Sequence, residues 1–290
     1  MNKSIEINGL SIFYREYGEQ NEESILLLHG NPTSSHMYKT LMMSLKDKYH
    51  VIAPDYPGFG FSSIPTTSEF EYTFENISKV VDQFIDALQL NHFYLFVQDY
   101  GGPIGFRIAA RRPQLIKGLI VQNANIYMEG MGEWAVEVGG YMQNNNVEAL
   151  NNYKAHLISL EGLKEQYVTG AKDVSKIDPA SYFLDYAFLN RPGVKDVFLT
   201  LFDDYGANFE KYEEWQNYLR TEQPATLIVW GANDKFFSKP GGEAFAKDLN
   251  DVEMHFFDGG HFMLEEYSAE VASLIDTFIS KKHKNVQVNV

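Results

Sequence analysis

Hydrophobic residues along this chain follow two patterns that alternate. Short runs rich in β-branched and aromatic residues, typical of strands, occupy residues 4–7, 10–17, 24–28, 49–53, 93–97, 118–122, 226–230 and 253–257. Longer segments with apolar residues three and four positions apart, typical of amphipathic helices, lie at 37–45, 74–90, 103–111, 242–249 and 269–281. We therefore predict an α/β fold with a mostly parallel eight-stranded sheet and helices on both of its faces. Asn8 and Gly9, a preferred hairpin dipeptide, predict an antiparallel edge at the start.

The alternation of strands and helices stops near residue 127 and resumes near residue 221. The segment between is helix-like, and it holds 9 of the chain's 18 tyrosines. Since the sheet pattern returns after it, we interpret residues 127–220 as an inserted helical cap. Residues 1–126 and 221–290 then form the core of the fold.

Composition narrows the classes of partner. The net charge of −15 argues against a nucleic-acid partner, because phosphate binding needs clustered Lys and Arg. The chain has no cysteine, which excludes thiolate metal sites and a cysteine nucleophile, and no metal or cofactor motif is present. Neither a signal peptide nor a run of about 18 apolar residues is visible, so we expect a cytoplasmic protein with no membrane partner. The sequence leaves open whether it is a monomer or a homodimer.

Residues with catalytic chemistry follow several of the predicted strands. Ligands of an open α/β sheet bind at the carboxyl ends of its strands, where Asp99, Asp234 and His261 all fall. Asp99 lies on a strand, sharp turn, helix arrangement, in the position that serine takes in a G-x-S-x-G nucleophile elbow. The chain order of the three residues is that of nucleophile, acid and base in α/β-hydrolases.

Five motifs carry a resemblance to a known family: HGNPTSS (29–35), PDYPGFGFS (54–62), VQDYGG (97–102), WGAND (230–234) and GGHFMLEE (259–266). The chain resembles the α/β-hydrolase superfamily, in the branch of haloalkane dehalogenases and epoxide hydrolases. The resemblance implies an aspartate nucleophile and an oxyanion hole made by the backbone N–H groups of Asn31 and Tyr100. Asn123 matches a position where some dehalogenases carry a catalytic Glu. An amide cannot act as that acid, which favours Asp234.

A carboxylate nucleophile restricts the reaction. Attack by Asp99 on a saturated carbon leaves an ester that water can cleave, whereas attack on an ordinary ester would give a reactive anhydride. We therefore predict hydrolysis of a small hydrophobic organic substrate at an sp³ carbon through a covalent alkyl-enzyme ester. His261 would activate water, and Asp234 would orient the imidazole.

The leaving group stays open at this stage. Dehalogenases of the family bind halide with a Trp beside the nucleophile and a second Trp or an Asn; this chain keeps Asn31 but has Tyr100 in place of the Trp. Epoxide hydrolases use two cap tyrosines as acids, and Tyr182, Tyr186 and Tyr205 of the later cap are our candidates for substrate binding. The nine tyrosines of the cap are Tyr127, Tyr141, Tyr153, Tyr167, Tyr182, Tyr186, Tyr205, Tyr212 and Tyr218. A non-catalytic sensor of small ligands on the same fold is the third hypothesis.

Overall fold

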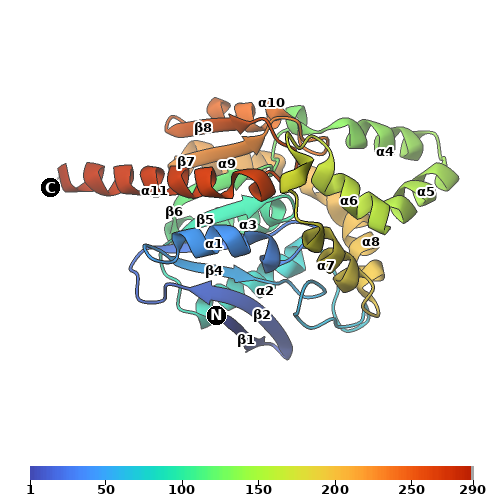
Figure 1. The fold of residues 1–290 in the computed structure, drawn as a ribbon, viewed down its shortest axis with the longest axis horizontal. Helices are drawn as coiled ribbons and strands as arrows, with labels where there is room; N and C mark the ends of the chain where they lie inside the picture. The colour runs from blue at the N-terminus through green and yellow to red at the C-terminus, as the bar shows by residue number, and fades with distance from the viewer. Residues whose placement is uncertain (289–290) are drawn as a thin grey trace.

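An eight-stranded sheet forms the centre of the fold (Figure 1). The computed structural model describes residues 1–288, and the side chains of residues 1–281. The strands, in the spatial order β1-β2-β4-β3-β5-β6-β7-β8, are β1 (Asn2–Ile7), β2 (Leu10–Tyr17), β3 (Ser24–Leu28), β4 (His50–Pro54), β5 (Phe93–Gln98), β6 (Ile116–Gln122), β7 (Thr226–Gly231) and β8 (Val252–Phe257). β2 pairs antiparallel with β1 and β4, and all other neighbours are parallel. The predicted fold class is confirmed.

Helices cover both faces of the sheet. α2 (Phe74–Ala87) and α3 (Gly101–Arg111) pack on one face, where the strands contribute Leu26 and Leu28 to the core. α1 (Lys39–Leu45) and α11 (Leu264–Val288) pack on the other, against Ile25 and Leu27. Successive strand residues thus enter opposite cores, which is why β3 has no polar alternation. None of the helices in residues 1–288 has the length and apolar character needed to cross a membrane.

The five predicted helices all have somewhat different boundaries in the structure, and for two of them a residue explains the difference. The helix expected at 74–90 ends at Ala87, and Gln89 beyond it takes a positive φ of 55° that closes the helix. The helix expected at 242–249 begins earlier, as α10 (Lys239–Ala244), followed by a short 3₁₀ turn, Phe245–Lys247. Pro240 lies in the first turn of α10, where its fixed φ favours a helix start.

Six further helices lie between β6 and β7: α4 (Glu133–Gln143), α5 (Val147–Leu157), α6 (Leu160–Val168), α7 (Pro179–Leu189), α8 (Val194–Asp204) and α9 (Tyr212–Glu222). Figure 1 shows α4 to α8 gathered beyond one end of the sheet. The last helix, α9, instead packs beside α3 on the sheet's own helical layer. The division into a core and a cap at residues 127 and 220 stays a prediction.

Close packing of α3 fixes the turn that precedes it. A Cβ atom on Gly101 would lie 2.0 Å from the carbonyl oxygen of Leu28, and one on Gly105 would lie 2.5 Å from a methyl group of Val97. Any larger side chain at either position would push α3 away from β3 and β5. The two glycines, four residues apart, therefore hold the start of α3 against the carboxyl ends of these strands.

Candidate active site

The turn between β5 and α3 presents a carboxylate at the edge of the sheet. Asp99 has a φ of +48°, an unusual conformation for a residue other than glycine. Strain of this kind costs about 1–3 kcal/mol and persists where the surroundings enforce it. Here Asp99 donates its N–H to the carbonyl of Asn123 at 3.2 Å, and Gly30 leaves room for its side chain, since a Cβ there would lie 2.4 Å from that of Asp99.

Backbone N–H groups stabilise the charged form of Asp99. The N–H of Asn31 donates to its Oδ1 at 2.6 Å, and the N–H of Tyr100 also bonds to this carboxylate. Burial raises the pKa of Asp99, while the attraction of His261 and these two N–H groups oppose the rise. Asn31 and Tyr100 therefore lie where the resemblance places the oxyanion donors.

An imidazole faces the carboxylate from the opposite loop. Nε2 of His261 lies 3.8 Å from Oδ2 of Asp99, and Nδ1 lies 2.8 Å from Oδ2 of Asp234. Burial lowers the pKa of His261, but attraction to Asp234 and Asp99 outweighs it, so the pKa is raised overall. This geometry lets His261 accept a proton on the side of Asp99 while Asp234 fixes its tautomer.

The side-chain amides of Asn123 and Gln98 and the backbone N–H of Phe236 contact Asp234 and His261. Asn123 donates from Nδ2 to Asp234 at 2.8 Å, and the N–H of Phe236 donates to the other carboxylate oxygen at 2.7 Å. The side-chain nitrogen of Gln98 lies 3.0 Å from Nε2 of His261. An amide N–H donates to that nitrogen only when it carries no proton, which is the form a general base needs. Sequence reasoning did not identify Gln98, although it directly precedes Asp99.

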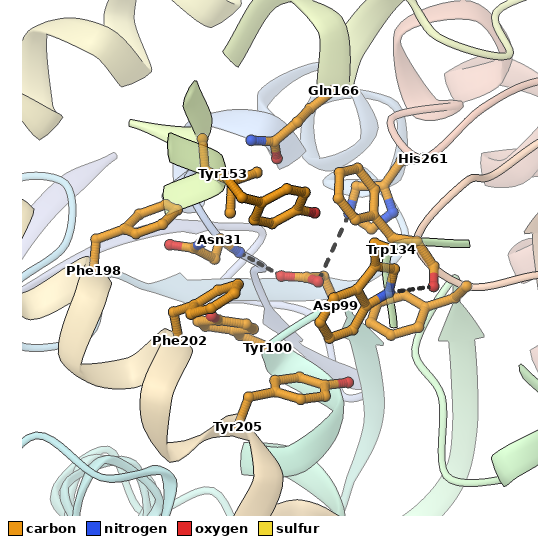
Figure 2. A pocket seen from close by; sticks show the side chains of 13 residues that line it. Asn31, Asp99, Tyr100, Trp134, Tyr153, Gln166, Phe198, Phe202, Tyr205 and His261 are labelled. Atoms are coloured by element: carbon orange, nitrogen blue, oxygen red, sulfur yellow. Dashed lines mark hydrogen bonds and ion pairs between the residues drawn. The ribbon is translucent and has the colours of Figure 1, made fainter. Parts of the chain in front are cut away.

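A cavity opens above Asp99 (Figure 2). Its walls are mostly aromatic, and the inserted helices supply more than half of them. The lining residues are Asn31, Asp99, Tyr100, Trp134, Tyr153, Leu157, Gln166, Phe198, Phe202, Tyr205, Phe236, Phe237 and His261. In Figure 2 the hydroxyl of Tyr153 and the amide of Gln166 point into the space over Asp99.

Only one of the three tyrosines predicted to bind substrate lines the cavity. Tyr205 lines the cavity, but Tyr182 and Tyr186 do not. They lie four residues apart on α7, where Tyr182 packs with Tyr167 and Phe262, and Tyr186 joins a hydrophobic cluster among the inserted helices. Helical periodicity places both on faces that pack against other helices.

Sequence reasoning missed three polar or amphipathic residues of the cavity wall: Trp134, Tyr153 and Gln166. Nothing in the pattern of the chain marks Tyr153 among nine tyrosines, since its orientation depends on how α5 packs. Trp134 cannot offer its indole N–H to a ligand in this structure, because it donates to the carbonyl of Phe236 at 2.8 Å.

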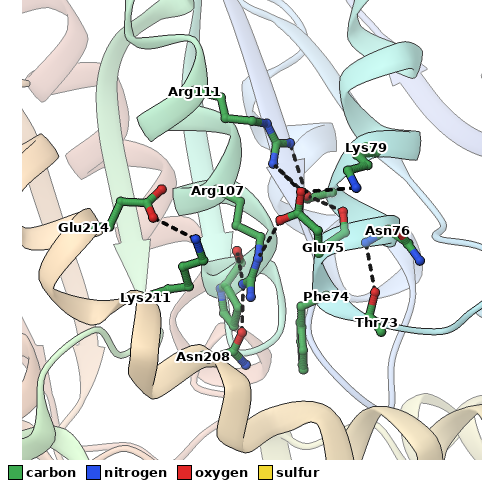
Figure 3. A network of polar contacts seen from close by, with 12 residues as sticks. Thr73, Phe74, Glu75, Asn76, Lys79, Arg107, Arg111, Asn208, Lys211 and Glu214 are labelled. Carbon is green, nitrogen blue, oxygen red and sulfur yellow. Dashed lines mark hydrogen bonds and ion pairs between the residues drawn. The ribbon is translucent and has the colours of Figure 1, made fainter.

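A polar network anchors the floor of the cavity (Figure 3). Arg107 of α3 is buried, and it donates to Oδ1 of Asn208 at 2.8 Å and lies 3.3 Å from Glu75. The N–H of Phe74, at the start of α2, donates to Asp204 at 2.9 Å. The Phe74 ring then packs edge-on against Tyr100, with the centroids 4.8 Å apart. These contacts tie the end of α8 and the following 3₁₀ segment, Tyr205–Lys211, to the core.

Among the described side chains, no group of three or more His, Cys, Asp or Glu residues could hold a metal ion.

A family model for the alpha/beta hydrolase fold matches residues 23–267. The chain belongs to the α/β hydrolase fold family. This α/β hydrolase is 36% identical over 272 residues to the uncharacterized hydrolase YNR064C of Saccharomyces cerevisiae, covering 92% of this chain and 93% of the relative.

Other relatives of this α/β hydrolase carry more specific names. A haloalkane dehalogenase of Psychrobacter cryohalolentis is 28% identical, covering 93% of this chain and 88% of the relative. A cis-3-alkyl-4-alkyloxetan-2-one decarboxylase of Shewanella oneidensis is also 28% identical, covering 94% of this chain and 86% of the relative. Among solved structures, the haloalkane dehalogenase DbeA-M1 loop variant from Bradyrhizobium elkanii superposes with a TM-score of 0.77 at 22% identity, covering 99% of both chains. This last similarity concerns the fold alone.

Proposed function

We propose that this α/β hydrolase cleaves a bond at a saturated carbon through a covalent ester on Asp99. The observation that carries the proposal is the position of its carboxylate, at the cavity wall with its charge held by the N–H of Asn31 and with Nε2 of His261 3.8 Å away. This arrangement supports Asp99 as the nucleophile, His261 as the base and Asp234 as the acid that orients the base.

The reaction proceeds in two displacements. An oxygen of ionised Asp99 attacks the carbon, the new C–O bond forms, and the leaving group departs with the electron pair of the bond that breaks. His261 then takes a proton from water, and the resulting hydroxide equivalent adds to the Asp99 carbonyl carbon. The N–H groups of Asn31 and Tyr100 stabilise the oxyanion. Collapse of this intermediate releases the alcohol, which receives its proton from His261.

Residues 127–220 act as the cap in this proposal. Their helices supply the part of the wall that excludes water, chiefly Trp134, Leu157, Phe198 and Phe202. Displacement of the first leaving group benefits from such a dry cavity, because a desolvated carboxylate is a stronger nucleophile. The cap therefore sets both the reactivity of Asp99 and the shape of the substrate.

We propose halide as the first candidate for the leaving group. The haloalkane dehalogenase that covers 93% of this chain supports this choice. Asn31 and Tyr100 both line the cavity beside Asp99, so an amide and a phenol are available to a departing halide. Trp134 does not contribute, since its indole N–H is already bonded to Phe236.

An epoxide is the second candidate, and Tyr153 favours it. Its hydroxyl points into the cavity over Asp99 and His261 (Figure 2). Burial raises the pKa of Tyr153 to about 12, so the phenol stays protonated at neutral pH and can donate to an opening epoxide oxygen. Tyr205 also lines the cavity, and its pKa is raised well above the usual value by burial.

A trapping experiment tests the proposal. His261→Gln should form the ester but fail to hydrolyse it, so incubation with 1-bromohexane or styrene oxide should add the mass of the alkyl or hydroxyalkyl group to the peptide that contains Asp99. Mass spectrometry of the digested protein reads this directly. Asp99→Asn should give no adduct, and His92→Gln, at an exposed site, should turn over normally.

The substrate that labels Asp99 decides the leaving group. Normal turnover by His261→Gln, or an adduct on another residue, would refute the proposed roles. Ligand-dependent thermal stabilisation without any adduct or product would instead support the non-catalytic sensor.

A further inference from the structure

One polar side chain of the cavity wall has no partner in the protein. Gln166 of α6 is only 7% exposed, and among the described residues its amide has no hydrogen-bond partner. Figure 2 shows this amide directed into the cavity above Asp99. Gln166 also lines a neighbouring, partly open cavity; the two cavities further share Trp134, Tyr153, Leu157, Phe236 and His261. The amide thus stands between the two spaces that a substrate can fill.

A buried amide without partners penalises an apolar ligand. Water can satisfy Gln166 while the cavity is empty, but a plain alkyl chain that displaces this water leaves its donor and acceptor unpaired. A ligand that carries its own hydrogen-bonding group avoids the penalty. Sites that hydrogen-bond a substrate group discriminate strongly against analogues without it, for this reason.

The backbone of Gln166 is fixed from the next residue. Tyr167 donates from its hydroxyl to Asp185 at 2.5 Å, and its ring stacks on Phe262 with the centroids 4.1 Å apart. Phe262 directly follows His261 in the chain. These two contacts of Tyr167 hold the backbone of α6, and with it the Cα of Gln166, at the cavity wall.

Charge around the neighbouring cavity selects against anions. Its lining includes the carboxylates of Glu133, Glu137 and Glu165, against a single lysine, Lys235. Glu165 contacts His156, with 2.9 Å between Nε2 and a carboxylate oxygen, which leaves the carboxylates of Glu133 and Glu137 beside one ammonium group. This excess of carboxylates disfavours a carboxylate or phosphate group at Gln166.

The other side of Asp99 is apolar. Phe198 and Phe202 form this wall, and Phe198 is shared with a further small cavity. That cavity is lined by apolar side chains such as Leu189 and Val194. The pocket thus offers a hydrophobic arm on one side of the carboxylate and an amide on another.

Building on the proposed function, we infer that Gln166 binds a neutral hydrogen-bonding group of the substrate. The substrate class is then an amphiphilic electrophile, with an alkyl part against Phe198 and Phe202 and a hydroxyl or a comparable neutral group at Gln166. Unfunctionalised haloalkanes or epoxides are poor substrates on this assignment.

Matched substrates test the inference. We compare 1-bromohexane with 6-bromohexan-1-ol, which differ only in a hydroxyl remote from the reacting carbon. In the unmodified enzyme, kcat/KM should be about tenfold or more higher for the bromoalcohol. Gln166→Met, of similar size but without the amide, should lose this preference, because kcat/KM for 1-bromohexane rises once no unpaired amide opposes the alkyl chain and kcat/KM for the bromoalcohol falls. Gln143→Met, at an exposed position of α4, serves as the control and should behave as the unmodified enzyme.

The outcomes separate this inference from the proposed function. Equal kcat/KM for both substrates in the unmodified enzyme, or a preference that survives Gln166→Met, overturns the role of Gln166 and leaves the reaction on Asp99 intact. If no electrophile labels Asp99, the proposed reaction is refuted. Calorimetric binding of 1-hexanol then tests separately whether Gln166 recognises a hydroxyl group. Weaker binding to Gln166→Met than to Gln143→Met supports the recognition of a hydroxyl, and equal binding overturns it.

Discussion

Asp185 provides a sharp test of the physical reasoning, because it is a carboxyl group with no charge partner inside the inserted helices. Its side chain is 1% exposed; Oδ2 accepts the hydroxyl of Tyr167, and Oδ1 has no partner. Burial raises its pKa from 3.8 to about 8. The folded protein therefore holds this group neutral at pH 7, while the unfolded chain ionises it.

The sign and size of the effect follow from proton linkage. Between the unfolded pKa of 3.8 and the folded pKa of about 8, the folded state binds the extra proton, so stability falls as pH rises through this window and levels off above it. The slope is about 1.4 kcal/mol for each pH unit. Asp185 therefore lowers the free energy of unfolding by at most about 4 kcal/mol between pH 5 and pH 8. Asp185→Asn has the shape of the neutral acid and can still accept from Tyr167, so it should lack this dependence.

Urea unfolding across pH measures the difference. Relative to the unmodified protein, Asp185→Asn should gain stability steadily from pH 5 to pH 8, by up to about 4 kcal/mol. Asp47→Asn, at an exposed position, should keep the original pH dependence. A constant difference between Asp185→Asn and the unmodified protein over this range would show that Asp185 is ionised in the folded state, and the reasoning would fail.

Three further predictions concern turnover. The rate should fall as pH drops through the pKa of His261, raised above 6.5, because the protonated imidazole cannot accept a proton from water; a flat pH-rate profile there would contradict the base assignment. Asn123→Leu removes the donor to Asp234, so it should slow ester hydrolysis more than ester formation in stopped-flow traces and cost about 1.5–3 kcal/mol of stability in urea titrations. Tyr153→Phe should lower kcat/KM for styrene oxide about 10²-fold and leave that for 1-bromohexane nearly unchanged; similar losses with both would indicate packing alone.

The core of the fold and three of its side chains could be predicted because their signals are local. β5 reads as a strand, its two following glycines are required by contacts with Leu28 and Val97, and Asp99 must then stand on the turn. Asp234 and His261 likewise follow β7 and β8, so the parallel sheet alone brings them to the same edge. In such a sheet, chain position determines spatial position.

The wall of the cavity could not be predicted in the same way. Tyr153, Tyr182 and Gln166 all lie on short amphipathic helices, and their surroundings depend on how these helices cross one another. Crossing geometry arises from the fit of many side chains and leaves no short-range pattern in the sequence. The sequence therefore predicts substrate contact for Tyr182, whose ring packs near Tyr167, and it does not mark Gln166, because a lone Gln on a helix is usually solvated.

The stacked rings of Tyr167 and Phe262 have a mechanical consequence. Each ring belongs to a residue adjacent in the chain to one that faces the cavity, Gln166 in one case and His261 in the other. An outward swing of α6 must either part the rings or pull the histidine loop along with it. If the rings stay together, substrate entry and displacement of His261 occur in one movement. The imidazole would then face Asp99 only when α6 closes the cavity.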